Sequence, residues 1–190
     1  MKRAFDFTAC ALFILISWPV LLVIAIAIRL QSPGAAIFAQ VRVGRGGHPF
    51  TCYKFRTMRT GTANVPTHQV EASSVTVLGE YLRRFKVDEI PQLYNVLTGD
   101  MSLVGPRPCL PSQAALVEAR KRLGVLTVLP GITGLAQSRG IDMSDPKRLA
   151  EVDAEYIRSQ SFAGDLKLIL STLRGRGVGV DRVVRDKTSG

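Results

Sequence analysis

The N-terminal part of the chain is much more hydrophobic than the remainder and predicts a membrane helix. Phe7 to Ile28 contains no charged side chain. As a helix with a rise of about 1.5 Å per residue, this run would be roughly 33 Å long, which is enough to cross the core of a bilayer. We therefore assign residues 1–30 to a membrane helix.

A break containing a serine and a proline interrupts this helix near its middle. Pro19 has no N–H for the carbonyl of Leu15, and its ring crowds that turn. Ser17 can bond back to a carbonyl one turn earlier and help to bend the helix. The break at Ser17 and Pro19 therefore favours a re-entrant helix, which enters the membrane and returns on the same side.

Charges on both sides of the apolar run agree with that topology. Because basic residues precede and follow it, the positive-inside rule would keep both flanks in the cytoplasm. Two alternatives remain open: a kinked helix that spans the bilayer, since proline is tolerated there, and a secretory signal, which the length of the run opposes. The flanking cations are Lys2, Arg3, Arg29, Arg42 and Arg45.

Two short runs after the membrane segment have the pattern of paired strands. Ala36 to Val43 and Pro49 to Met58 are joined by the glycine-rich residues 44–47, which is typical of a β-hairpin. Lys54 and Arg56 lie two positions apart, so both would project from one face of the second strand. These two cations could bind phosphate, although a solvated basic face explains them equally well.

Apolar residues at helical spacing predict helices over residues 75–85, 111–125, 145–159 and 162–173, and a short one from residue 90 to a stop at Gly99. The helix at 162–173 is amphipathic and suits either core packing or a membrane surface. Residues 59–74 are predicted to form a mobile loop. The helix at 111–125 carries charges that predict a solvated face: Glu118, Arg120, Lys121 and Arg122.

Together these elements predict an α+β fold. It is a mostly helical, membrane-associated domain with a short β-hairpin and an N-terminal re-entrant membrane helix. We expect a cytoplasmic domain over residues 31–173, with interfacial amphipathic helices. The basic tail, residues 174–190, is expected to be partly disordered and attracted to anionic lipid headgroups.

Composition narrows the choice of partner. The net charge of +10 favours an anionic partner, whereas the positive mean hydropathy of +0.17 points to a membrane surface rather than to nucleic acid. The cysteines Cys10, Cys52 and Cys109 lack metal-ligand spacing and suit reduced thiols in the cytoplasm. The two histidines lie in polar stretches, which argues against a histidine-based metal site.

The highest density of chemically active side chains lies between residues 86 and 108. Asp88 and Glu89 are adjacent carboxylates, Asp100 is a third, and Arg107 stands between two prolines. This group suggests a site for phosphate and a divalent metal. Asp88 also stands where the N-cap of the next helix belongs. The two roles are compatible, because a helix N-terminus favours the ionised carboxylate that a nucleophile or metal ligand requires.

A second candidate for anion binding is the glycine-rich loop at residues 129–134, which continues to Gln137 and Arg139. Closely spaced glycines let backbone amides approach an anion. Most such loops are only turns, so the signal is weak when taken alone.

These motifs, in this order, resemble the monotopic phosphoglycosyl transferases, which are bacterial sugar transferases, in their small single-domain form. The resemblance covers about residues 2–173 and rests on the Ser/Pro break, YKFRTM, DEIPQLYNVLTGDMSLVGPRP, PGITGLAQ and a D-x-x-Y pattern at Asp153. The break reads Ser-Trp-Pro rather than Ser-Pro. The residues after Gln137 also depart from the family's usual pattern, which leaves the role of Arg139 open.

The resemblance implies a reaction at the cytoplasmic face of the bacterial inner membrane. Such enzymes move a phosphosugar from a UDP-sugar onto undecaprenyl phosphate, release UMP and require Mg²⁺. Asp88 matches the family's nucleophile, which forms a covalent intermediate, and Glu89 matches the second acid of the dyad; both are the expected metal ligands. Three cations match positions near the phosphates: Lys54, Arg83 and Arg107.

A membrane-anchored nucleic-acid-binding module is the rival that the basic charge supports. The sequence shows no basic helix with interleaved aromatics, zinc pattern or RNA-binding aromatic motif, so we expect no nucleic-acid partner. A scaffold anchor without chemistry is a third alternative. The sugar and the glycan pathway stay open, and a homo-oligomer is compatible with the sequence.

Overall fold

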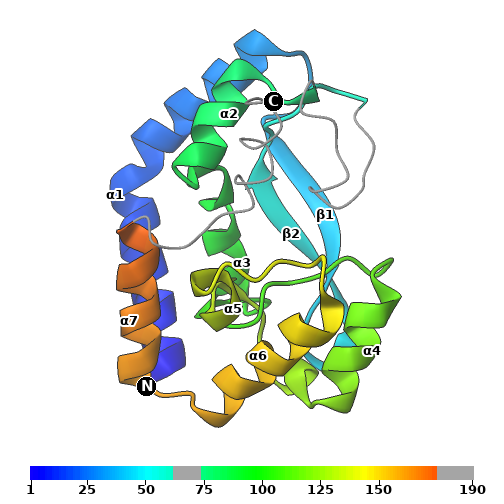
Figure 1. The fold of residues 1–190 in the computed structure, drawn as a ribbon. Helices are drawn as coiled ribbons and strands as arrows, with labels where there is room; N and C mark the ends of the chain where they lie inside the picture. Colours follow the sequence, from blue (N-terminus) through cyan, green and yellow to red (C-terminus); the bar gives the residue numbers. More distant parts are fainter. Residues whose placement is uncertain (62–73, 175–190) are drawn as a thin grey trace.

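The computed structural model describes residues 1–61 and 74–174 and has the predicted α+β architecture, with a long N-terminal helix beside a domain of shorter helices and strands (Figure 1). The predicted basic tail, residues 174–190, lies outside the described residues except for Arg174, and so does most of the predicted loop at 59–74. The main helices are α1 (Lys2–Gln31), α2 (Val77–Arg84), α3 (Gln92–Thr98), α4 (Ala114–Arg122), α5 (Leu135–Ser138), α6 (Pro146–Arg158) and α7 (Phe162–Leu173), and the strands are β1 (Ile37–Val43), β2 (Pro49–Phe55), β3 (Ser102–Val104) and β4 (Gly131–Thr133).

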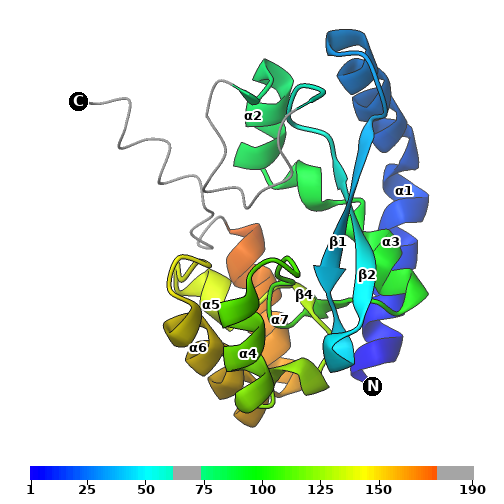
Figure 2. The same ribbon diagram turned by 90° about the vertical axis from the view of Figure 1, so that its right-hand side faces the viewer.

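Helix α1 continues through the predicted break. Pro19 lies inside it, and the Ser17 hydroxyl donates to the carbonyl of Phe13 at 2.7 Å, as the sequence predicts. The two views show that the first and second halves of the helix are not collinear (Figures 1 and 2). By length and composition α1 could cross a membrane, and most of its apolar side chains are exposed.

Polar contacts attach the first turns of α1 to the domain. The Lys2 ammonium lies 2.6 Å from a carboxylate oxygen of Asp165 in α7. The Ser102 hydroxyl donates to the buried carboxylate of Asp6 at 2.6 Å. The Arg3 guanidinium donates to two carbonyls around the end of α3, at residues 97 and 101. The N-terminus of α1 is therefore held at a defined position.

The other end of α1 is held by Arg56. Its guanidinium donates to the carbonyls of Ser32 and Pro33, the latter at 2.7 Å. Ile28 packs in a buried cluster with Phe55 and Leu82. Arg56 therefore caps the C-terminal end of α1, and the alternative in which it joins Lys54 at phosphate is not supported by its contacts.

The predicted hairpin is confirmed. Strands β1 and β2 are antiparallel, with Ile37 opposite Phe55 and Val43 opposite Pro49. The second strand ends at Phe55 rather than Met58, which instead forms an isolated bridge with Val75. The strand ends early because the chain turns there to meet α1 and α2.

A second, parallel pair of strands was not predicted. β3 and β4 pair Ser102 with Gly131 and Val104 with Thr133, and β4 lies in the segment that the sequence presents as a glycine-rich loop. Gly131 lies so close to the chain at Gly105 that an added Cβ would be 2.0 Å from the Gly105 nitrogen. These glycines therefore permit two backbones to pack, and the anion-loop interpretation lacks support.

We expect Gly131→Ala to destabilise the fold by about 3 kcal/mol or more, because the methyl group meets backbone atoms that cannot move independently. The measurement is the midpoint of thermal or denaturant unfolding in detergent. Gly124→Ala is the control: nothing lies within 4 Å of its Cβ, so it should cost only the left-handed backbone penalty of about 1–2 kcal/mol. Equal losses in the two variants would contradict the close packing of β3 and β4.

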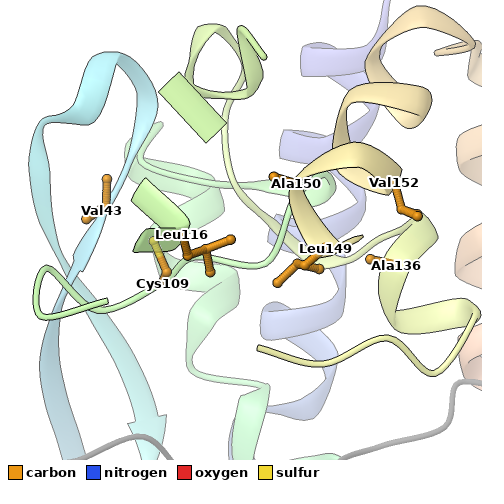
Figure 3. Packing of buried hydrophobic residues seen from close by; sticks show 7 residues of the cluster. All are labelled: Val43, Cys109, Leu116, Ala136, Leu149, Ala150 and Val152. Atoms are coloured by element: carbon orange, nitrogen blue, oxygen red, sulfur yellow. The ribbon is translucent and has the colours of Figure 1, made fainter. Parts of the chain in front are cut away.

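The main core lies between the hairpin, α4 and α6. Figure 3 shows its buried side chains. The core cluster consists of Val43, Cys109, Leu116, Ala136, Leu149, Ala150 and Val152.

Asp145 caps α6 by accepting from the Arg148 amide at 3.0 Å, close to the predicted start of that helix.

Candidate active site

The two adjacent carboxylates lie in a tight turn between α2 and α3. Asp88 and Glu89 belong to a 3-10 turn, η4 (Val87–Glu89), which follows Lys86 in a left-handed conformation with φ of 56°. Lys86 is the one non-glycine residue with positive φ among those that the structure describes. Such a backbone reverses the chain abruptly, and η4 packs against β2, which carries Lys54.

Asn95 fixes α3 against β2. Its side chain is fully buried, accepts from the Tyr53 amide at 3.1 Å and donates to the Thr51 carbonyl at 2.7 Å. The predicted stop at Gly99 is confirmed, with φ of 98°. Helix α3 is thus anchored on the strand, and the dyad at its N-terminal side is held in register with Lys54.

Glu89 accepts from two cations that come from distant parts of the chain. Lys54 Nζ lies 2.7 Å and an Arg107 nitrogen 2.5 Å from the same oxygen, Glu89 Oε1. Burial opposes ionisation of Glu89, but attraction to Arg107 and Lys54 outweighs it and holds the pKa well below its usual range. Glu89 is therefore an ionised carboxylate locked in place.

Asp88 differs from its neighbour. Within the described residues it makes no hydrogen bond or ion pair, although Glu89 makes two. Burial, followed by the negative charge of Glu89, raises the pKa of Asp88 to about 6. The raised pKa is opposite in direction to the shift that a helix N-terminus would produce, although a carboxyl with a pKa of about 6 is still mainly ionised at neutral pH.

The proposed N-cap role of Asp88 is also wrong. Helix α3 starts at Gln92, its N-cap position is Pro91, and no side chain caps it. The turn η4 takes up residues 87–89, so α3 begins after it. The Asp88 carboxylate therefore caps no helix and has no hydrogen-bond partner among the described residues.

Arg83 lies at the edge of this group. Its Nε donates to the Thr57 hydroxyl at 2.9 Å, and its charge lowers the pKa of Asp88, though less than Lys54 and Arg107 do. The structure therefore brings together the dyad and all three cations that the sequence assigns to phosphate. Asp100 does not join them, since its carboxylate accepts from Thr98 in a local turn.

Gln137 and Arg139 have other contacts. The Gln137 amide donates to the Ile132 carbonyl at 2.9 Å, and its buried oxygen has no partner within the described chain. Arg139 forms a two-pronged surface pair with Glu155. Within the part of the chain that the structure describes, neither side chain bonds to the dyad, and a substrate role for them stays a prediction.

One expectation for α4 is corrected by the structure. Arg120 was predicted on a solvated face, but it is 2% exposed and pairs with the equally buried Asp153 of α6. A charged residue in a polar helix gives no sign of burial before the partner is known. The D-x-x-Y pattern that begins at Asp153 was the sequence feature that could have indicated this buried pair.

The residues present fit Mg²⁺ in the way that the family resemblance implies. The described residues contain no group of three or more His, Cys, Asp or Glu side chains that could hold a metal by itself. Mg²⁺ typically uses one or two carboxylates together with substrate phosphates and water. Asp88 and Glu89 are a donor set of that kind, and a cation would relieve the charge repulsion that raises the pKa of Asp88.

Comparison with known proteins identifies the class. The model of the bacterial sugar transferase family matches residues 1–176. The chain therefore belongs to the bacterial sugar transferase family, which is a family of transferases.

Three particular relatives are 41–42% identical to this chain over the residues that align. The chain is 41% identical to the UDP-glucose:undecaprenyl-phosphate glucose-1-phosphate transferase of Caulobacter vibrioides, over 90% of this chain and 68% of that protein. It is 41% identical to the undecaprenyl-phosphate glucose phosphotransferase of Komagataeibacter xylinus, but spans only 35% of it. It is 42% identical to a sugar transferase of Bacillus subtilis described as uncharacterised, over 92% of this chain and 86% of that protein.

Proposed function

We propose that this protein transfers a phosphosugar from a UDP-sugar to undecaprenyl phosphate and releases UMP, as the first membrane step of a glycoconjugate pathway. The observation that carries the proposal is the contrast within the dyad. Glu89 is held by Lys54 and Arg107, whereas Asp88 has no partner among the described residues. A carboxylate without a structural role, next to two cations suited to phosphate, supports the assignment of Asp88 as the nucleophile.

The proposed reaction has two steps. The ionised Asp88 carboxylate attacks the phosphorus that bears the sugar, the bond to the bridging oxygen breaks, and UMP leaves with the bond electrons. A phosphate oxygen of the polyprenyl lipid then attacks the same phosphorus and releases Asp88. The covalent intermediate lets the soluble nucleotide depart before the lipid binds.

Lys54, Arg107 and Arg83 supply positive charge for the diphosphate. A carboxylate and a diphosphate repel each other, so the attack requires that this charge be neutralised. The Arg107 fork suits phosphate oxygens. Mg²⁺ would be held by Asp88 and Glu89 and, when bound, would neutralise phosphate charge and stabilise the leaving group.

The experiment that tests the proposal measures UMP release from a panel of UDP-sugars with undecaprenyl phosphate and Mg²⁺. UDP-glucose is the first sugar to test, since two of the relatives above are named for glucose. Another relative, from Aeromonas hydrophila and 36% identical, is named for N-acetylgalactosamine, so the panel must include amino sugars. No UMP release with any sugar would contradict the proposal.

We also propose a monotopic location at the cytoplasmic face of the bacterial inner membrane. Helix α1 has 30 residues and a length of about 45 Å. A spanning helix of that length would place its ends on opposite sides of the bilayer. Both ends instead contact one domain, through Lys2 with Asp165 and Arg56 with Ser32, which favours the re-entrant arrangement.

Helix α7 is also suited to lie at the membrane surface. Its apolar residues Phe162, Leu166 and Leu170 are 48%, 41% and 42% exposed, and the Phe162 ring meets Phe5 of α1 edge-on at 5.3 Å. An apolar stripe that stays open to solvent beside a membrane helix suits the headgroup region. If α7 lies at the membrane interface, the domain that carries Asp88 and Glu89 lies at the depth of a lipid phosphate.

We expect single cysteines at Ala4 and at Gln31 both to be protected from a membrane-impermeant maleimide until the inner membrane is permeabilised. Both positions are exposed at opposite ends of α1, and neither carries the contacts that hold the helix. The background replaces Cys10, Cys52 and Cys109, all of them buried. Labelling at Ala4 but not at Gln31, with only the outer membrane opened, would establish a spanning helix.

A further inference from the structure

The turn that carries Arg107 is held by its carbonyls. The Gly131 amide of β4 donates to the Pro106 carbonyl at 2.9 Å, and the Val43 amide of β1 donates to the Cys109 carbonyl at 2.9 Å. Both ends of the turn are therefore joined to strands by ordinary backbone hydrogen bonds.

Between these ends, two arginine side chains take the place of backbone donors. Arg120 Nη1 donates to the Arg107 carbonyl at 2.8 Å, and Arg42 Nη1 donates to the Pro108 carbonyl at 3.2 Å. Four consecutive carbonyls, at residues 106–109, are thus engaged by donors from three elements, β1, β4 and α4. Proline supplies no N–H, so this turn cannot be fixed by amides at positions 106 and 108.

Arg120 is the more deeply buried of the two arginines. Its side chain and that of Asp153 are each 3% exposed, and its Nε and Nη2 donate to one oxygen of Asp153 at 3.0 and 2.6 Å. A buried ion pair costs desolvation, and an apolar pair of similar volume often holds two helices equally well. The pair does what an apolar contact cannot, because it orients the guanidinium so that Nη1 faces the Arg107 carbonyl.

We propose that Arg120, oriented by Asp153, is a positioning residue for the transfer reaction: it fixes the main chain at Arg107 and so aims the Arg107 guanidinium at the dyad. The proposal rests on the proposed function, in which Arg107 binds substrate phosphate. Arg120 itself lies behind the turn, and its three hydrogen bonds within the described residues go to Asp153 and to the Arg107 carbonyl. Its effect on the reaction therefore passes through Arg107.

The first test is Arg120→Lys. Lysine can keep the ion pair with Asp153 but has no planar fork to reach the Arg107 carbonyl as well. We expect kcat for UMP release to fall by about tenfold or more, because a small displacement of a positioned group is costly in the transition state. KM for the UDP-sugar should change less than kcat, and the unfolding midpoint should change little. Arg122→Lys is the matched control on the same helix, since Arg122 is exposed and its ion pair among the described residues is with Glu118.

A double-mutant cycle separates positioning from a general structural role. In an Arg107→Lys background the planar fork that needs aiming is already absent, so Arg120→Lys should add much less than it does alone. If Arg120→Lys slows both backgrounds by the same factor, Arg120 acts independently of Arg107 and the proposal is overturned. Full activity of Arg120→Lys overturns it too.

A second variant covers the case in which Arg120→Lys does not fold. Arg120→Met combined with Asp153→Leu removes both charges and keeps an apolar contact, so it should be at least as stable as the parent. It should nevertheless show the same fall in kcat, and a folded pair with full activity would overturn the proposal. Unimpaired turnover by Arg107→Lys alone would instead refute the phosphate role of Arg107 in the proposed function, and the positioning role with it.

Discussion

Asp88→Asn is expected to reduce UMP release by more than about a thousandfold while the protein folds and binds membranes as before. Asparagine cannot attack phosphorus, and removal of a nucleophile commonly costs several orders of magnitude. A thousandfold corresponds to about 4 kcal/mol of transition-state free energy. The measurement is turnover with UDP-sugar and lipid phosphate, together with trapping of a labelled phosphosugar on the protein, which should also disappear.

The stability of Asp88→Asn distinguishes a catalytic role of Asp88 from a structural one. Asp88 caps no helix and makes no ion pair within the described residues, and its pKa is raised to about 6 by burial and by Glu89. A raised carboxylate pKa means that ionised Asp88 destabilises the fold, and that the destabilisation develops as the pH rises from about 4 to about 6. At neutral pH the unfolding midpoint of Asp88→Asn should therefore equal or exceed that of the parent.

Asp100→Asn is the matched control for this experiment. It makes the same change to a nearby carboxylate whose contact is the local bond from Thr98, so turnover should be preserved. Substantial turnover by Asp88→Asn would contradict the nucleophile assignment. It would also restore the alternative in which the protein is a membrane anchor without chemistry.

Arg107→Lys is expected to lower kcat/KM by about a hundredfold. Lysine keeps the charge but loses the planar fork that can bind Glu89 and a phosphate group together, and loss of one oriented donor typically costs about two to three orders of magnitude. The bond from Arg107 to Glu89 shows that the fork already points at the dyad. The measurement is steady-state kinetics of UMP release over a range of UDP-sugar concentrations.

Arg148→Lys is the control for Arg107→Lys, because Arg148 is exposed on α6 and pairs only loosely with Glu151. Unchanged kinetics for Arg107→Lys would make Arg107 a structural residue of its turn. A loss confined to KM would indicate that Arg107 binds the ground state and the transition state equally.

Local patterns accounted for several elements. The apolar run placed α1, the glycines at 44–47 placed the hairpin turn, and α7 has the bounds that its apolar spacing predicts. These features depend on neighbours in the sequence, so a period or a turn residue is sufficient to find them. The short parallel pair was missed because β3 and β4 have three residues each and no period of their own.

The acidic dyad and its cations were also predicted in part, but from a family resemblance rather than from a local pattern. Asp88, Glu89 and Arg107 lie within one stretch whose motifs resemble those of a known family, and Lys54 was assigned through the same resemblance. That Lys54 and Arg107 both bind Glu89, while Arg56 binds the end of α1, could not be read from spacing. Lys54 and Arg56 are equivalent cations on one strand until the packing of α1 separates them.

The sequence by itself determined that the chain has a long apolar helix, a hairpin and an acidic dyad near a proline-flanked arginine, because each is a local pattern of residue types. Only the tertiary structure decided which carboxylate is paired, which has no partner among the described residues, and that Arg120 is buried behind the turn that carries Arg107. The physical reason is that charge pairing and desolvation depend on contacts between residues far apart in the chain. The same polar side chain is solvated or buried according to what packs against it.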